Sequence, residues 1–209
     1  MFSLQTMFGK GDKFYGLLEA SAQAARDGAA ALQQLLEHRG ETPMLDSFRA
    51  ARRREKQLAS QISEALVNTF VTALDREDIE AMSSALYRIP KTIEKFAERY
   101  AIVSGRLDDV DFSSRAALLM RATEVLVEMV SELRNGLRIN QMRALQDRLQ
   151  AIESEADRML LDPYRGLYTA GGDPIRVLLA KDLFELMEKA IDRCRDVGNV
   201  IYSIVLKNS

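Results

Sequence analysis

KDLFELMEKAIDRCRDVGNVIYSIV, residues 181–205, is the stretch that indicates how this chain folds. Its apolar residues recur at alternating spacings of four and three, which places them along one side of a helix; they are Leu183, Met187, Ala190, Cys194, Val197, Ile201 and Ile204. A row of this length predicts a long helix with one buried face. Because Cys194 belongs to the row, we expect it to be a small buried side chain rather than a nucleophile.

The same pattern occurs 101 positions earlier in the chain. The equivalent positions are all apolar or aromatic: Met82, Leu86, Ile89, Ile93, Phe96, Tyr100 and Val103. This offset also places Phe48, Ala51 and Leu58 on Leu149, Ile152 and Met159. The chain is therefore an internal duplication. We predict an all-α fold of two tandem three-helix bundles with long antiparallel helices, in which residues 1–108 form the first unit and residues 109–209 the second.

Local start and stop signals divide the first unit into three helices. Asp12 is the expected N-cap of the first helix. Thr42 and Pro43 are typical of a cap and a first-turn proline, so a second helix is expected from there to about Phe70. Asp75 is expected to open the third helix.

The second unit has similar signals. A fourth helix is expected over about 112–134 and a fifth up to Pro163, which would end or kink it. Asp173 and Pro174 predict the cap and first residue of the sixth helix.

Composition limits the functional classes. The chain has 209 residues, 47% of them hydrophobic, with 29 basic against 31 acidic side chains. This balance gives no indication of nucleic-acid binding. No apolar run approaches the roughly 20 residues of a membrane span, and the N-terminal residues lack the pattern of a signal peptide. The single cysteine fits a reducing compartment. We therefore expect a cytoplasmic protein without a transmembrane segment.

Carboxylates flank the apolar row on two consecutive helices. Glu188, Asp192 and Asp196 lie about one turn apart, and Glu153 and Asp157 take similar positions on the preceding helix. Like charges at this spacing repel by roughly 0.2–0.5 kcal/mol per pair in an isolated helix, and a bound cation would offset the repulsion. Oxygen ligands without histidine or cysteine suit Mg²⁺, Mn²⁺, Ca²⁺ or ferric iron. The alternative is a solvated acidic face, neutralised by neighbouring Lys and Arg side chains.

The first unit lacks these acids. At the equivalent positions it has Arg52, Lys56, Tyr87, Lys91 and Lys95. A metal site is therefore expected in the second unit alone.

The densest basic run also lies in the first unit; it consists of Arg49, Arg52, Arg53, Arg54 and Lys56. It is either a solvated helix face or a surface for an anionic partner, which could be a membrane surface, a phosphate ion or an acidic patch on another subunit. The reversal of charge between the units also admits a homo-oligomer, in which the basic surface of one molecule meets the acidic surface of the next.

Several segments resemble one known family. They are MFGKGDKFYGLL (7–18), TFVTALDREDIEAM (69–82), IESEAD (152–157), KDLFELMEKAIDRCRDVGNVI (181–201) and VLKNS (205–209). These segments resemble the PhoU-like regulators of phosphate transport. More narrowly, they are similar to the bacterial accessory proteins of Pit-type low-affinity phosphate transporters. The resemblance spans nearly the whole chain.

This resemblance implies a fold of two three-helix bundles, no established catalytic activity, and multinuclear iron or zinc sites held by carboxylates. Glu153, Asp157, Glu188 and Asp192 match the family's motif of an acidic residue, three residues and Asp, and Asp196 is a further acidic position. The function expected from it is regulation of inorganic phosphate transport through contact with a Pit-type transporter, with membrane contact limited to the surface. Two alternatives remain. One is a metal-dependent phosphohydrolase that uses the same carboxylates, and the other is a metal-free helical scaffold.

Overall fold

A computed structural model describes the backbone of residues 4–38, 44–136, 138–169 and 173–208, and the side chains of these residues except 4–12 and 160–169. Within these ranges the chain forms long α-helices, one short 3-10 turn and no strand, which confirms the all-α prediction. None of the helices in these ranges is long and apolar enough to cross a membrane. The elements are α1 (Leu4–Glu37), α2 (Asp46–Val67), α3 (Arg76–Val103), η1 (Ser104–Arg106), α4 (Ser113–Arg134), α5 (Ile139–Thr169) and α6 (Pro174–Lys207).

Two predicted helix starts are confirmed. The Asp173 carboxylate caps α6 by accepting a hydrogen bond from the backbone N–H of Ile175 at 3.0 Å. α3 begins directly after Asp75, but the Asp75 carboxylate makes no capping hydrogen bond and pairs instead with Lys207 at the end of α6. The local pattern thus located both starts, whereas tertiary packing decided the partner of Asp75.

Three predicted helix boundaries differ from those of the structure. α1 begins well before Asp12, which therefore lies inside the helix; α2 ends at Val67, three residues before the predicted end near Phe70; and α5 continues through Pro163, so this proline does not end the helix. The predicted cap at 42–43 lies outside the described residues. Caps and helix-breaking residues are local effects of about 1–3 kcal/mol, and in long helices the packing of a buried face outweighs them.

The two apolar rows found in the sequence are buried. In α6 each member from Leu183 to Ile204 is at most 2% exposed, and in α3 each member from Met82 to Tyr100 is at most 5% exposed. Cys194 is fully buried, its thiol donates to the Ala190 carbonyl at 3.4 Å, and burial raises its pKa far above the ordinary value. The prediction of a buried structural cysteine is confirmed.

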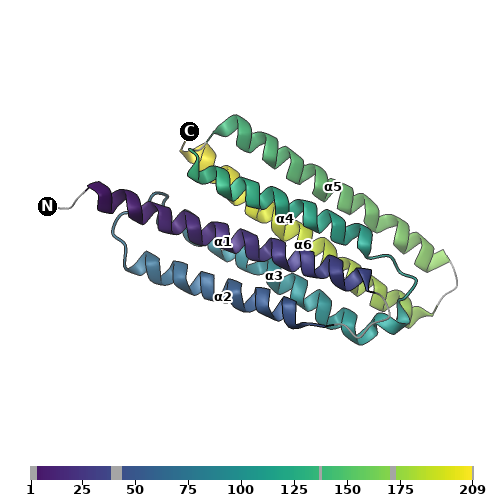
Figure 1. Ribbon diagram of the computed structural model, residues 1–209. Coiled ribbons are helices and arrows are strands. Elements are labelled where there is room, and N and C mark those ends of the chain that lie inside the picture. Colours follow the sequence, from purple (N-terminus) through teal and green to yellow (C-terminus); the bar gives the residue numbers. More distant parts are fainter. Residues whose placement is uncertain (1–3, 39–43, 137, 170–172, 209) are drawn as a thin grey trace.

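Equivalent helices of the two units pack against each other. α1 packs on α4, and α3 packs on α6 (Figure 1). α3 and α6 are antiparallel, because Lys207 pairs with Asp75 and Asp78 at one end, while Arg99 pairs with Asp182 toward the other. α2 lies outside α1 and α3, and α5 lies outside α4 and α6, so these two helices occupy opposite sides of the molecule.

One hydrophobic core runs through the molecule, with buried residues from every α-helix. Within each unit the three helices also pack on one another. Whether each unit folds independently depends on its own stability, which the packing alone does not give. The domain boundary between residues 108 and 109 therefore stays a prediction.

α5 and α6 approach each other closely at Gly198. A Cβ atom at this position would overlap the Cδ2 atom of Leu149 and lie 2.9 Å from the Oε1 atom of Gln146. The absence of a side chain therefore permits this short separation.

Candidate functional site

The five predicted metal ligands lie where α5 and α6 meet, but two of them have arginine partners. Glu153, whose side chain is 12% exposed, pairs across the interface with Arg195 of α6. Asp196 pairs with Arg193 on its own helix at 2.8 Å. Guanidinium groups therefore already neutralise part of this acidic surface.

The other three carboxylates, those of Asp157, Glu188 and Asp192, repel one another. Burial and then the charges of Asp192 and Asp157 raise the pKa of Glu188 above its usual value. The pKa of Asp192 is also raised, first by burial; Arg195 opposes this effect, and Asp157 adds to it. The repulsion expected from the sequence is thus present in the folded chain.

As the structure describes them, these side chains are not gathered into a ligand set for a multinuclear iron or zinc cluster. Among the described side chains, no group of three or more His, Cys, Asp or Glu residues is placed to hold a metal ion. Glu153 and Asp196 form ion pairs with arginines, as described. The charge of Arg115 also favours the ionised form of Glu188 by lowering its pKa, against the larger effect of burial. The metal site stays a sequence-based prediction for which the side chains form no ligand set.

We expect protein purified without a chelating tag to contain less than one iron or zinc ion per chain, because arginines already pair with Glu153 and Asp196, two of the five predicted ligands. Elemental analysis by mass spectrometry would measure this before and after incubation with iron, zinc and manganese. The control is the double variant Asp157→Asn plus Asp192→Asn. A fixed metal ratio in the wild type that disappears in this variant would contradict the expectation and support the predicted site.

The members of the basic run on α2 have different surroundings. Arg52 donates a hydrogen bond to the Tyr87 hydroxyl, with its guanidinium carbon 3.9 Å from the centre of the Tyr87 ring. Among the described residues, no ion pair or hydrogen bond engages Arg53 or Lys56, which are exposed and remain available to a partner. The other members pair in different directions: Arg49 with Asp46 (3.7 Å), Arg52 with Glu94 (3.9 Å) and Arg54 with Asp27 (3.2 Å).

A second group of cations, which we did not identify as a site from the sequence, lines a pocket of about 310 Å³ between α3 and α6. In the sequence, Lys91 and Lys95 are notable only because they replace acids of the second unit. The signal that could have found the pocket is the pairing of equivalent helices, which brings basic residues of both repeats together. The lining residues are Arg88, Lys91, Thr92, Lys95, Leu186, Lys189 and Arg193.

The chain has the fold of the PhoU-like proteins. A crystal structure of a PhoU-like protein from Shewanella oneidensis MR-1 superposes with a TM-score of 0.74 at 16% sequence identity, covering 93% of this chain and 99% of that chain. A second structure from the same organism, described as a "putative PhoU-like phosphate regulatory protein", gives a TM-score of 0.73 at 15% identity with the same coverage. These neighbours confirm the fold that the resemblance in the sequence implied.

Two named proteins are similar in sequence, although no protein-family model matches the chain. UPF0111 protein YkaA of Bacillus subtilis (strain 168) is 26% identical over 145 residues, which are 69% of this chain and 70% of that protein. A protein of Rhizobium meliloti (strain 1021) named "Putative pit accessory protein" is 21% identical over 201 residues, 94% of each chain. Both are distant relatives.

Proposed function

We propose that this protein is a cytoplasmic accessory protein that regulates inorganic phosphate transport by contact with a Pit-type transporter, and that it catalyses no reaction. The observation that carries the proposal is the match over 94% of both chains to the Rhizobium protein named as a Pit accessory protein. The PhoU-like fold supports the same role, because one of the structural neighbours is described as a phosphate regulatory protein.

The loop between α2 and α3 offers a surface for this contact. Val67, the last residue of α2, is 81% exposed, and Phe70 and Val71 in the loop are 102% and 61% exposed. Arg76 holds the loop by donating a hydrogen bond to the carbonyl oxygen of Thr69 at 2.6 Å. Apolar side chains that an ordered loop presents together to solvent are typical of a contact with another protein. We therefore assign the transporter contact to this loop.

Phe70→Ser is expected to weaken association with the transporter at least tenfold, since aromatic anchors contribute much of the energy of an interface. Stability should change by less than about 0.5 kcal/mol, because Phe70 has no buried contacts to lose. Co-purification with the transporter from membranes and uptake of radiolabelled phosphate by cells that lack the native protein would measure both the contact and its effect.

Ile102→Ser is the matched control, because Ile102 is 82% exposed near the opposite end of α3. It should leave association unchanged. Equal losses in both variants would argue against the loop as the contact. If the wild-type protein does not associate with the transporter and its removal leaves phosphate uptake unchanged, the proposed function is rejected.

A further inference from the structure

The pocket between α3 and α6 is basic on both sides. Five of its seven lining residues are Lys or Arg, and none is Asp or Glu. Its remaining lining residues are Thr92 and Leu186, which are buried beneath the cations. A concave surface with this composition attracts anions, because charges of one sign reinforce one another within it.

The antiparallel packing of α3 and α6 brings these cations to the same height. Arg99 of α3 pairs with Asp182 of α6, one turn beyond Lys95 along α3. From this pair onward the residue numbers fall along α3 and rise along α6, so the α3 cations lie opposite residues 186–193. The pocket is thus a product of the duplication and of the contact between the two units.

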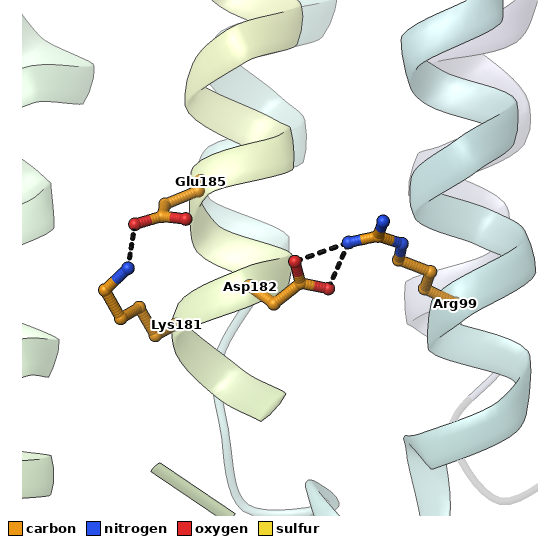
Figure 2. Close-up of polar contacts among 4 residues, drawn as sticks. All are labelled: Arg99, Lys181, Asp182 and Glu185. Carbon is orange, nitrogen blue, oxygen red and sulfur yellow. Dashed lines mark hydrogen bonds and ion pairs between the residues drawn. The ribbon is translucent and has the colours of Figure 1, made fainter. Parts of the chain in front are cut away.

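Two acids of α6 near this pocket, Asp182 and Glu185, pair with residues outside it. Figure 2 shows Asp182 pointing toward Arg99, while Glu185 pairs with Lys181 on the other side of α6. Of the cations in the pocket, Arg193 is paired, with Asp196 at 2.8 Å. Among the described residues, no ion pair or hydrogen bond from the side chain neutralises the other four, which are Arg88, Lys91, Lys95 and Lys189.

We infer that this pocket binds a small soluble anion with two or more linked phosphate groups, such as inorganic diphosphate or triphosphate. Lysine ammonium groups act as point charges, and arginine guanidinium groups donate in a fork that matches phosphate oxygens. A volume of about 310 Å³ lies at the low end of the roughly 300–1,000 Å³ typical of small-molecule sites. A short chain of phosphates suits such a volume.

The number of charges favours linked phosphates over a single phosphate. One phosphate group carries about 1.5–2 negative charges near pH 7, so it would leave about half of the four unneutralised cations without a counter-charge. Two or three linked groups neutralise the cluster more completely. The inference rests on the pocket alone and is independent of the proposed transporter contact.

Isothermal titration calorimetry of the full chain with sodium tripolyphosphate, pyrophosphate and orthophosphate tests the inference. We expect one site per chain, with tripolyphosphate binding at least tenfold more tightly than orthophosphate and more weakly as salt increases. Lys91→Gln plus Lys189→Gln should weaken tripolyphosphate binding at least tenfold, because it removes one cation from each side of the pocket. If this double variant folds poorly by circular dichroism, Lys95→Gln alone should weaken binding at least threefold.

Lys13→Gln plus Arg106→Gln is the matched control, since it removes two charges from exposed positions outside the pocket. Its affinity for tripolyphosphate should stay within threefold of the wild type. An equal loss in both double variants, or no saturable binding of any soluble phosphate, would overturn the inference.

A second arm tests a lipid headgroup as the source of phosphate. Phosphatidylglycerol vesicles should compete poorly with free tripolyphosphate in a flotation assay. If the protein binds the vesicles, does not bind free tripolyphosphate, and is not displaced from the vesicles by it, the cations belong to a membrane-binding surface instead. If the pocket binds no soluble phosphate, the proposed role in phosphate transport is unaffected, because these assays use the isolated protein and do not measure contact with the transporter.

Discussion

Glu55→Gln is expected to stabilise the protein at pH 9 by about 3–5 kcal/mol. Glu55 lies in α2 and has no exposed surface. Burial raises the pKa of its carboxyl from 4.5 to about 8, against smaller opposing effects of the Ser21 hydroxyl and the charges of Arg52 and Arg54. Keeping a carboxylate ionised in this position costs free energy, and a neutral glutamine of similar shape removes that cost.

The sign of the pH dependence follows from the raised pKa. Below about pH 4.5 Glu55 is protonated in both the folded and the unfolded chain, so it does not destabilise the fold. Between pH 4.5 and about 8 the unfolded chain releases this proton more readily than the folded chain, and stability falls as the pH rises. Above about pH 8 the full penalty is present. The benefit of Glu55→Gln should therefore grow across this window and then level off.

Urea unfolding followed by circular dichroism at pH 5, 7 and 9 would measure the effect. The difference between variant and wild type isolates Glu55, because the partly buried carboxyls of Glu94, Glu188 and Asp192 are present in both proteins. Glu64→Gln, at an exposed position on the same helix, is the control and should change stability by less than about 0.5 kcal/mol at every pH. A difference between Glu55→Gln and wild type that stays constant with pH would contradict the expectation.

The burial of Glu55 could have been predicted from the sequence. Phe48, Ala51, Leu58 and Ile62 are the buried residues before and after it in α2, and their spacing requires a buried residue at position 55. Its equivalent in the second unit is the buried Ala156. Because Glu55 follows three arginines in the chain, the basic run looks like a continuous solvated face, and the burial of this acid is easily missed.

The fold was largely predictable because it depends on the periodic spacing of apolar residues, which can be read directly from the sequence. The two apolar rows, the duplication and the all-α class required only spacing. Helix ends were less predictable, since Asp12 and Pro163 are strong local signals that long packed helices override.

The candidate sites depend on side-chain direction, which spacing does not specify. Sequence placed Glu153 and Arg195 on neighbouring helices, but only the packing of α5 on α6 makes them a pair. The same limit applies to the pocket, since Lys91 and Lys189 meet only because equivalent helices of the two units pack against each other.

Phe112→Ala is expected to lower the free energy of unfolding by about 3–5 kcal/mol, the usual cost of removing a buried aromatic side chain. Phe112 precedes α4 and is 1% exposed. The centre of its ring lies 5.7 Å from that of Phe96 and 5.9 Å from that of Tyr100, both on α3, and 4.8 Å from that of Phe184 on α6. It therefore joins the helices of both units in one aromatic cluster.

Because the core is continuous through this cluster, the two units should unfold together, in the variant as in the wild type. Urea unfolding followed by far-ultraviolet circular dichroism and by tyrosine fluorescence would give coincident transitions, both shifted by the same amount. Phe70→Ala is the control, since the same side chain is fully exposed there at 102% and its loss should cost less than about 0.5 kcal/mol. Two separated transitions, with only one shifted by Phe112→Ala, would instead mean that residues 1–108 and 109–209 fold as independent units and that the aromatic cluster contributes little to joining them.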